Sequence, residues 1–251
     1  MSSAVQQARQ GVFLGTSCIL SIALLILVIA IGVSVGELSI PLQTVFYAIG
    51  NKMGFTDVPL SRIFESVIWD FRLSRALVAA CCGAGLAICG AVLQSLLKNA
   101  LAEPYVLGVS AGASTGAVSV VVLGIGTGAV SLSAGAFAGA FAAFVFVAFL
   151  TNGARGGNER TILAGVAASQ LFNAITAYTI STSASAQQAR DVMFWLLGSF
   201  SGVRWPELQL VLIVVLTGLA ICLYYSRALD AFTFGDDAAA SLGIAVPWVS
   251  L

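Results

Sequence analysis

The residue types that most often carry out chemistry are scarce in this sequence, and those present are poorly placed for it. The chain contains no histidine, which excludes histidine acid–base catalysis and histidine-ligated metals. Metal sites and structural disulfides usually show paired cysteines in polar or turn-rich segments, but every cysteine of this chain lies in an apolar run. We interpret them as small residues that pack within helices; they are Cys18, Cys81, Cys82, Cys89 and Cys222.

The carboxylates and lysines offer no better catalytic site. Asp236 and Asp237 are adjacent but lie outside the apolar runs, so a buried aspartate pair for intramembrane catalysis is not evident. Neither Lys52 nor Lys98 follows a glycine-rich phosphate loop, so the chain does not bind ATP in that way. We therefore predict a protein that is not an enzyme, with no catalytic residue, no metal ligand and no bound cofactor.

The composition indicates whether this chain is surrounded by water or by lipid. Of its 251 residues, 59% are hydrophobic and 9% are charged, whereas a soluble domain carries roughly 25% charged residues. Such a chain lacks the polar side chains to cover a water-facing surface. The 11 basic and 11 acidic residues balance, so no basic surface for nucleic acid is expected. We predict an all-α integral membrane protein, a polytopic helix bundle in contact with membrane lipid.

Uncharged runs place the membrane spans, because a helix needs about 20 residues to cross the hydrocarbon core. The first run, Val12–Val35, lacks a signal-peptide cleavage site and precedes further spans, so we expect it to be retained. Residues 1–251 then form a single transmembrane domain, in which residues 228–251 follow the last span. Six spans are expected, at about 12–35, 76–97, 105–123, 134–150, 161–181 and 207–226.

Two shorter stretches do not cross. Val192–Val203 is apolar but too short, and it fits equally a half-helix beside a transport pathway or an interfacial helix anchored by tryptophan. Between Pro41 and Gly50 we expect a short amphipathic helix on the surface. Its apolar residues recur at helical spacing, and they are Leu42, Val45, Phe46 and Ile49.

Two further patterns concern packing and orientation. Glycines recur every four residues in two of the spans, which allows helix backbones to approach closely in lipid. Five basic residues fall on one side of the membrane and six on the other, so the positive-inside rule does not orient the chain. The glycines are Gly108, Gly112, Gly116, Gly135 and Gly139.

Four blocks of sequence, in a fixed order, carry a family resemblance. The first, residues 72–113, contains Arg72-Leu-Ser-Arg75, Gly83-Ala-Gly-Leu-Ala87 and Asn99-Ala-Leu-Ala-Glu-Pro104. The chain closely resembles the permease family of ABC importers for iron–siderophore complexes, haem and cobalamin. Ala100 stands where that family usually has proline, so a less rigid turn is expected there. The other blocks are Leu163-Ala-Gly165, Trp195-Leu-Leu-Gly198-Ser199 and the stretch from Gly235-Asp-Asp237 to Leu242-Gly243.

The resemblance implies an architecture and a set of partners. Family members have ten spans, so this chain would lack the last four and be partial. They form homodimers, or heterodimers with a paralogue, in the bacterial cytoplasmic (inner) membrane, with both termini in the cytoplasm. Gly36–Arg75 and Ser181–Trp205 would then face outward, and Asn99–Pro104, Thr151–Arg160 and the segment after Arg227 inward. A separate ATP-binding cassette ATPase would use ATP and magnesium, and a periplasmic or lipid-anchored substrate-binding protein would deliver the cargo.

The resemblance also implies roles for particular residues. Arg72 and Arg75 would dock the binding protein, although arginines at a span end also anchor it at lipid headgroups. The stretch 235–243 would contact the ATPase; the alternative is a solvated helix without a partner. Glu159 would belong to a gate on the cytoplasmic side, and for this residue a solvated turn is an equal alternative. The remaining expected residues are Asn99, Leu101, Asn158 and Glu159 at the cytoplasmic gate; Gly235, Asp236, Asp237, Ala239, Leu242 and Gly243 at the ATPase contact; and Ser169, Asn173, Thr176 and Ser199 along the pathway.

These patterns predict the membrane-spanning permease subunit of an ATP-driven importer. An iron–siderophore complex is the first expectation for the cargo, with haem and cobalamin open. The alternative is an ion- or proton-coupled secondary transporter, which usually carries ionisable residues within its spans. The cores of the spans placed here contain none, which counts against that alternative.

Overall fold

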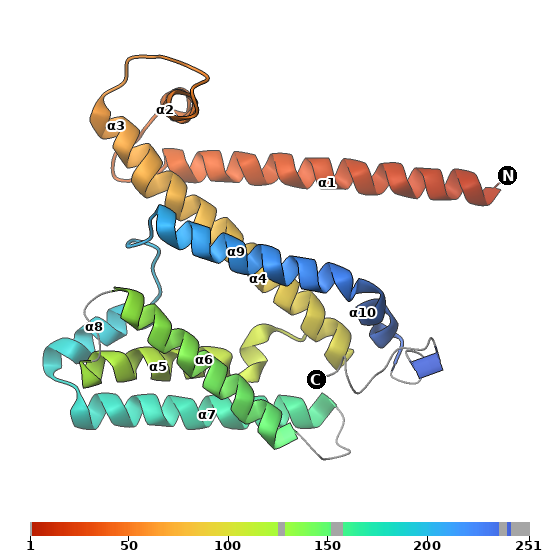
Figure 1. Cartoon of the computed structure of the whole chain (residues 1–251), viewed down its shortest axis with the longest axis vertical. Coiled ribbons are helices and arrows are strands. Elements are labelled where there is room, and N and C mark those ends of the chain that lie inside the picture. Colours follow the sequence, from red (N-terminus) through yellow and green to blue (C-terminus); the bar gives the residue numbers. More distant parts are fainter. Residues whose placement is uncertain (1, 125–128, 152–157, 236–239, 242–251) are drawn as a thin grey trace. The chain divides into compact units, whose positions relative to one another are not determined.

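The computed structural model describes residues 2–124, 129–151, 158–235 and 240–241, and over these ranges the chain is helical without strands (Figure 1). It divides into two compact units, residues 1–84 with 200–216 and residues 85–199 with 217–251. Within the described part, five helical stretches are long and apolar enough to cross a bilayer, which confirms the predicted all-α membrane fold. They are Gly15–Ser34, Arg62–Leu97, Leu132–Thr151, Glu159–Thr182 and Trp205–Tyr224.

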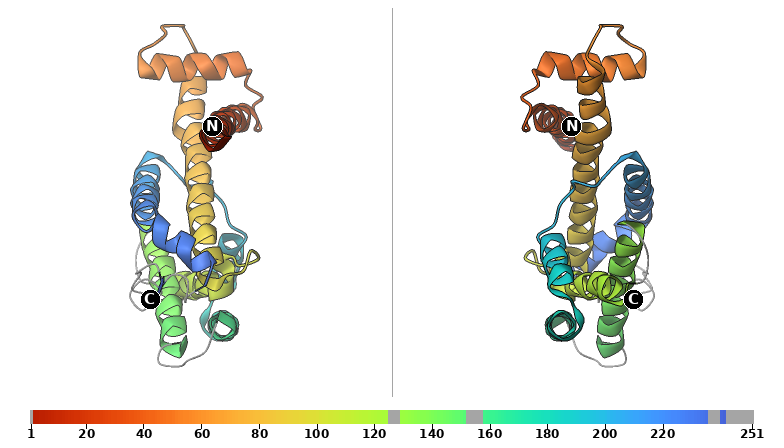
Figure 2. Two further views of the ribbon diagram at one scale, coloured as in Figure 1. Left: turned by 90° about the vertical axis from the view of Figure 1, so that its right-hand side faces the viewer. Right: turned by 90° about the vertical axis from the view of Figure 1, so that its left-hand side faces the viewer.

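The first unit is built around the junction of its helices. α1 (Ser2–Ser34) leads through a turn into α2 (Leu42–Met53), and α3 (Arg62–Ser66) continues through the π-helix η1 (Val67–Leu73) into α4 (Ser74–Leu97). Figure 2 shows α2 running crosswise to α3. Buried side chains from α1, the turn after it, α2 and η1 meet where these elements join, and they are Val33, Ile40, Val45, Ala48, Ile68 and Leu73.

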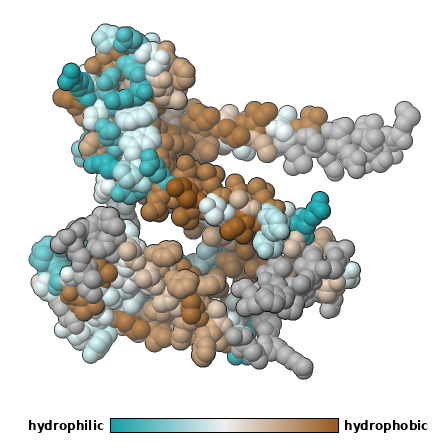
Figure 3. Space-filling view, viewed as in Figure 1, coloured by the Kyte–Doolittle hydropathy of each residue, from teal (hydrophilic) through white to brown (hydrophobic). Residues whose placement is uncertain are grey.

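The surface of the first unit separates apolar from polar elements. Large apolar side chains of α1 are open to the surroundings; Leu20 is 72% exposed and Ile26 59%. Figure 3 shows apolar residues over the coloured part of α1, whereas hydrophilic residues gather over α2 and α3. A helix with this exposure is stable only in lipid, so α1 spans the membrane and the α2–α3 end lies toward water.

The amphipathic helix predicted before Gly50 exists, but its predicted end is wrong. α2 continues to Met53 and ends on Gly54, which adopts a left-handed conformation with φ 78°. Gly50 lies inside the helix, where a Cβ atom would approach Thr56 Oγ1 to 2.6 Å. The Thr56 hydroxyl donates to Asn51 Oδ1 over 2.8 Å, and this bond helps to hold the following loop against the helix. The glycine therefore marks a close approach of two segments and not the end of the helix.

The second unit contains the short η2 (Pro104–Leu107) and five further helices within the described ranges, besides the later parts of α4 and α9. The predicted span at 105–123 is divided at Gly108, which has φ 71° between η2 and α5. α5 packs against both α6 and α7. The helices are α5 (Val109–Leu123), α6 (Ala129–Thr151), α7 (Asn158–Ser183), α8 (Ala186–Leu196) and α10 (Ser226–Thr233), and α9 spans Trp205–Tyr224.

Glycines hold α5 and α6 together, as their spacing predicts. A Cβ atom on Gly139 would overlap the Gly112 carbonyl oxygen and lie 2.8 Å from the backbone nitrogen of Gly116. A hydrogen bond adds to the packing of α5 against α7, since the hydroxyls of Thr115 and Thr176 are 2.8 Å apart. Close backbone packing and buried hydroxyl bonds are the forces that join helices in lipid.

Candidate functional site

The Arg72 side chain lies against the end of the first span. Its Nη1 donates to the carbonyls of Val33 and Ser34, both over 3.0 Å, and its Nη2 donates to the carbonyl of Leu38. The last carbonyls of a helix have no partner inside it, and basic side chains satisfy them and favour the helix dipole. Arg72 therefore caps α1 from a position on η1.

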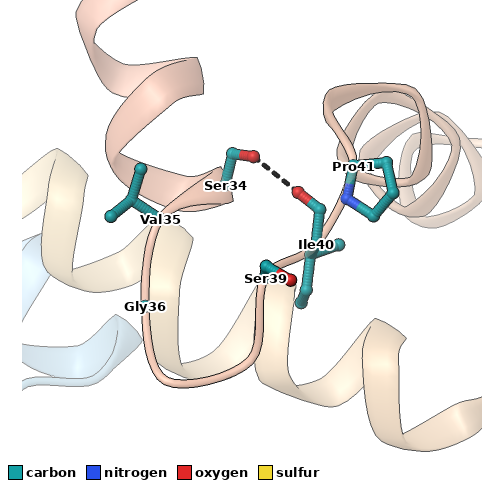
Figure 4. A pocket seen from close by; sticks show the side chains of 6 residues that line it. All are labelled: Ser34, Val35, Gly36, Ser39, Ile40 and Pro41. Atoms are coloured by element: carbon teal, nitrogen blue, oxygen red, sulfur yellow. Dashed lines mark hydrogen bonds between the residues drawn. The ribbon is translucent and has the colours of Figure 1, made fainter.

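The turn beside this arginine is hollowed (Figure 4), with six lining residues between α1 and α2. The Ser34 hydroxyl donates to the Ile40 carbonyl and closes the turn. A Cβ atom on Gly36 would lie 2.7 Å from Arg72 Nη2, so a larger residue at this position would displace the guanidinium from the end of α1. The lining residues are Ser34, Val35, Gly36, Ser39, Ile40 and Pro41.

Arg75 and Arg204 order the stretch that leads into α9. Arg75 Nη2 donates to the Ser201 carbonyl over 3.0 Å, while its Nε is buried without a partner. The Arg204 guanidinium lies 3.8 Å from the centre of the Phe71 ring, an attractive cation–π arrangement. The described contacts of Arg72 and Arg75 are all with backbone carbonyls, so their positive charges are not neutralised by a carboxylate of this unit.

The turn after α4, predicted to form part of a gate, is held by hydrogen bonds. Lys98 takes a left-handed conformation with φ 50°, and the Asn99 amide donates to the Gln94 carbonyl over 3.2 Å, the pattern of a Schellman helix end. Asn99 Oδ1 accepts from the Leu101 amide over 2.9 Å, and Gln94 Nε2 donates to the Ala100 carbonyl over 3.1 Å. These bonds hold the turn although Ala100 replaces the family's proline. Leu101 at its tip is 87% exposed.

The second predicted gate turn leads into α7. Asn158 is the first residue of that helix, and Glu159 lies exposed in its first turn. Arg160 Nη2 donates to the Leu150 carbonyl over 3.0 Å and so links the start of α7 to the end of α6. An acidic residue in the first turn is favourable for the helix dipole, which is a structural reason for Glu159.

The four predicted pathway residues fall into two pairs. Thr176 is buried and bonded to Thr115, and Ser169 is partly buried, with its hydroxyl donating to the Gly165 carbonyl over 2.9 Å. Asn173 on α7 and Ser199 after α8 are exposed. Thr176 therefore faces α5, and Ser169 lies beside Gly108 at the junction of η2 and α5. Of the four residues, Asn173 and Ser199 have the exposure that a pathway lining needs.

Asn173 was predicted from the sequence, but the residues that share a row with it on an exposed face of α7 were not. Gln170, Asn173, Ala174, Ala177 and Ser181 are all exposed and recur at helical spacing. All five are small or uncharged polar residues. The signal that would have found them is the helical period taken from Asn173, which leads to Gln170 and Ala177.

The start of α8 was also not predicted from the sequence. The helix begins at Ala186, before the apolar run, because Ser185 and Gln188 form a reciprocal capping box: the Gln188 amide donates to the Ser185 hydroxyl, and Gln188 Oε1 accepts from the Ser185 amide. Gln188 Nε2 also donates to the Val121 carbonyl of α5 over 3.1 Å. The Ser-x-x-Gln spacing is the signal that could have placed this start.

The predicted ATPase-contact segment is preceded by a helix that was not anticipated. α10 packs its Ala231 and Phe232 against Leu96 of α4. Gly235 follows it with φ 112°. The other predicted contact residues, Asp236, Asp237, Ala239, Leu242 and Gly243, lie outside the described residues. Within the described ranges, no cluster of three or more acidic or cysteine side chains could hold a metal ion.

Comparison with known proteins decides the family. The model of the FecCD transport family matches residues 24–251. The chain belongs to the FecCD transport family. Among solved structures, this FecCD member is similar to one described as an inward-facing conformation of a metal-chelate type ABC transporter, with a TM-score of 0.76 and 26% identity. That similarity covers 94% of this chain and 70% of the other.

Relatives in the FecCD family include cobalamin permeases. The cobalamin import system permease protein BtuC of Halobacterium salinarum is 36% identical over 72% of this chain and 49% of its own length. The vitamin B12 import system permease proteins BtuC of Serratia proteamaculans and Escherichia coli are 37% and 38% identical, over 71% and 72% of this chain and 53% and 55% of their own lengths. The chain spans about half the length of the curated relatives it matches.

Proposed function

We propose that this chain forms the membrane-spanning part of a permease subunit in an ATP-driven importer of metal chelates. The observation that carries the proposal is the FecCD match, which runs from within the first span to the last residue. The permease itself performs no chemistry in this proposal. It provides a passage from an external binding protein to the cytoplasm, across the cytoplasmic membrane of a bacterium.

The cargo class follows from the relatives and from the exposed face of α7. The relatives named above import cobalamin, so cobalamin is the first cargo to test, with iron–siderophore complexes and haem in the same class. One row of exposed residues on α7, which includes Gln170, Asn173 and Ala177, is small or weakly polar and uncharged. A lining of this kind offers a large chelate no strongly binding site, which suits passage. Ser199 would extend this lining on the outer side.

The partners are assigned to the two ends of the spans. Arg72 and Arg75 present uncompensated positive charge at the outer end, which suits acidic side chains on the two lobes of a binding protein. At the inner end, the turns at Asn99–Leu101 and at Asn158–Glu159 would meet those of a second permease subunit and close the passage. The segment 228–251, including Gly235–Gly243, would receive a separate ATPase that uses ATP and magnesium.

Co-purification tests this assignment. The intact permease is expressed with the ATPase and the binding protein encoded beside it, and ATP hydrolysis is measured with and without the binding protein. We expect the ATPase to co-purify and its turnover to rise when the binding protein is added. A control ATPase that lacks its phosphate-loop lysine should assemble without hydrolysis. A permease that purifies without any ATPase and still transports in response to an ion gradient would establish the secondary transporter instead.

A further inference from the structure

We propose that α2 lies in the interface of the membrane at the end of the first span and rests an apolar stripe on the lipid there. The stripe consists of Leu42, Phe46 and Met53. In the orientation proposed above, this lipid belongs to the outer leaflet. The inference takes only that orientation from the proposed function, and its other arguments rest on the membrane fold, so it holds whatever cargo the permease carries.

The open side of α2 carries apolar side chains. Leu42 is 42% exposed, Phe46 61% and Met53 58%. With about 3.6 residues per turn, the three residues fall within about 40° of one another around the helix axis. An exposed apolar stripe of this kind indicates contact with a protein partner or with a membrane, so its occupant has to be identified.

Two other sides of α2 are occupied by the protein itself. Val45 and Ala48 are buried in one cluster with Ile68 of η1. Asn51 Nδ2 donates to the Val58 carbonyl over 2.7 Å, and Asn51 Oδ1 accepts from the Val58 amide over 3.1 Å, which holds the following loop against the helix. These contacts fix the rotation of α2, and the stripe is the side that they leave open.

The first span sets the depth of α2. The apolar stretch Gly15–Ser34 has 20 residues, and its length of about 30 Å matches the thickness of the hydrocarbon core. Val33 lies in the last turn of this stretch and belongs to the same buried cluster as Val45 and Ala48, against which Ile29 also packs. α2 therefore lies level with the last turn of the span, where acyl chains meet headgroups.

The direction of α2 and its surroundings favour lipid as the occupant. Figure 1 shows α2 end-on while α1 lies along the picture, and Figure 2 shows α2 running crosswise. At the same level, Ile31 of α1 is 46% exposed and Val35 just after it 70%, so the lipid around α1 continues to this depth. A helix that lies in the plane of the interface buries its apolar face among the lipids. A soluble protein would have to displace that lipid to reach the stripe.

This contact gives α2 a role in presenting the docking surface. The cluster of Val45 and Ala48 includes Ile68 and Leu73, which belong to the same π-helix as Arg72. α2 therefore supports η1 from the membrane surface, and it fixes the height of Arg72 above the lipid.

Nitroxide spin labels measure the depth of the stripe. The intact permease, with its native cysteines replaced by serine, receives one labelled cysteine and is reconstituted in vesicles of phosphatidylethanolamine and phosphatidylglycerol. Collisions of the label with oxygen, which dissolves in lipid, and with a water-soluble nickel complex give its depth. The test variants are Leu42→Cys, Phe46→Cys and Met53→Cys.

Three control positions calibrate the measurement. Leu24→Cys is the lipid reference, because Leu24 is 59% exposed at the middle of the first span. Asp57→Cys is the water reference, because Asp57 is exposed in the loop after α2. Gln43→Cys is the matched control on α2, because Gln43 is exposed but lies outside the stripe.

We expect the three stripe labels to lie about 5–10 Å into the boundary between headgroups and acyl chains, and to collide with oxygen more often than with nickel. The label at Leu24 should lie deeper, and the label at Asp57 should collide freely with nickel. The label at Gln43 should lie closer to water than the label at Leu42, because the two side chains leave the helix about 100° apart.

Two outcomes would overturn the proposal. Stripe labels that collide with nickel as freely as the label at Asp57 would place the stripe in water. Stripe labels that are shielded from both reagents would show that protein covers it, such as a second permease subunit. Transport is not part of this measurement, so a permease that imports no chelate would refute the proposed function and leave the measured depths unchanged.

A second variant serves if the cysteine-free permease fails to insert. Phe46→Trp keeps the native cysteines, and the emission of the parent is subtracted to correct for the native tryptophans. Lipids brominated in their acyl chains should quench the added indole emission of Phe46→Trp more strongly than that of Gln43→Trp. Equal quenching of the two variants would refute the proposal.

Discussion

Charge reversal at Arg75 should slow docking of the binding protein without unfolding the permease. Arg75 makes a single described hydrogen bond, to the Ser201 carbonyl, and its charge faces no carboxylate within its unit. An exposed ion pair is worth about 0–1 kcal/mol, and a two-fold dimer presents the arginine twice. Two pairs worth about 0.5–1 kcal/mol each correspond to a change of about 5- to 30-fold in association with the binding protein.

The same change at Arg72 has a different expected result, because this side chain also caps α1. Arg72→Glu removes three hydrogen bonds and places a carboxylate against the carbonyls of Val33, Ser34 and Leu38. Hydrogen bonds to charged groups are worth about 1.5–3 kcal/mol each, and water replaces part of this at a half-exposed site. A net loss of about 2 kcal/mol would lower the melting temperature by about 4–8 °C for a chain of this size.

Two measurements separate the docking role from the capping role. They are the rate of association with the binding protein at low and at high salt, and thermal unfolding of the permease in detergent. Arg75→Glu should associate slowly in low salt and lose the difference at high salt, where the Debye length falls to about 3 Å. It should melt closer to the parent than Arg72→Glu does, because it loses one described hydrogen bond and not three. Arg62→Glu is the matched control, since Arg62 is exposed at the start of α3 and makes the same change in net charge. Wild-type association of Arg75→Glu in low salt would refute its docking role, and an unchanged melting temperature of Arg72→Glu would refute the cap.

Two further predictions concern the bundle. Gly139→Ala should destabilise the permease by about 1–3 kcal/mol and lower its melting temperature, because the added Cβ atom would overlap the backbone of α5. Gly90→Ala is the control and should not lower it, because its Cβ atom would meet nothing within 4 Å. Equal melting temperatures of the two variants would contradict the close packing of α5 and α6. Thr176→Val should lower the free energy of unfolding by about 1 kcal/mol, because it removes the bond to Thr115, and it should leave cargo selectivity unchanged. Thr179→Val should melt as the parent does, because the Thr179 hydroxyl bonds only within its own helix. Altered cargo selectivity of Thr176→Val would show that Thr176 lines the pathway.

Features that depend on composition and local period could be predicted from the sequence. The apolar runs predict the spans because only a helix satisfies its backbone in lipid. The spacing of Gly112, Gly116, Gly135 and Gly139 predicts close contacts between helices, and the structure places these contacts between α5 and α6. The start of α8 also depends on local sequence alone, but the capping signal at Ser185 was not used.

Features that depend on distant partners could not be predicted. The bonds of Arg72 join it to a carbonyl 39 residues away, and no local pattern shows that the end of α1 returns to η1. α7 carries small or polar residues on its buried side as well as on an exposed side, so its sequence does not show which face packs on α5. This is why Ser169 and Thr176 were assigned to a pathway that their described contacts do not favour. Gly50 was read as a helix end because a glycine that admits Thr56 and one that ends a helix look alike in sequence.

Uptake of cargo into vesicles tests the central claim most directly. The intact permease, reconstituted with its ATPase, is given radiolabelled cyanocobalamin, a ferric siderophore or haem, each with the binding protein, in the presence of a protonophore. We expect at least one chelate to accumulate inside the vesicles when ATP is available, and none to accumulate without ATP. Accumulation that requires a proton or sodium gradient and is indifferent to ATP would contradict it.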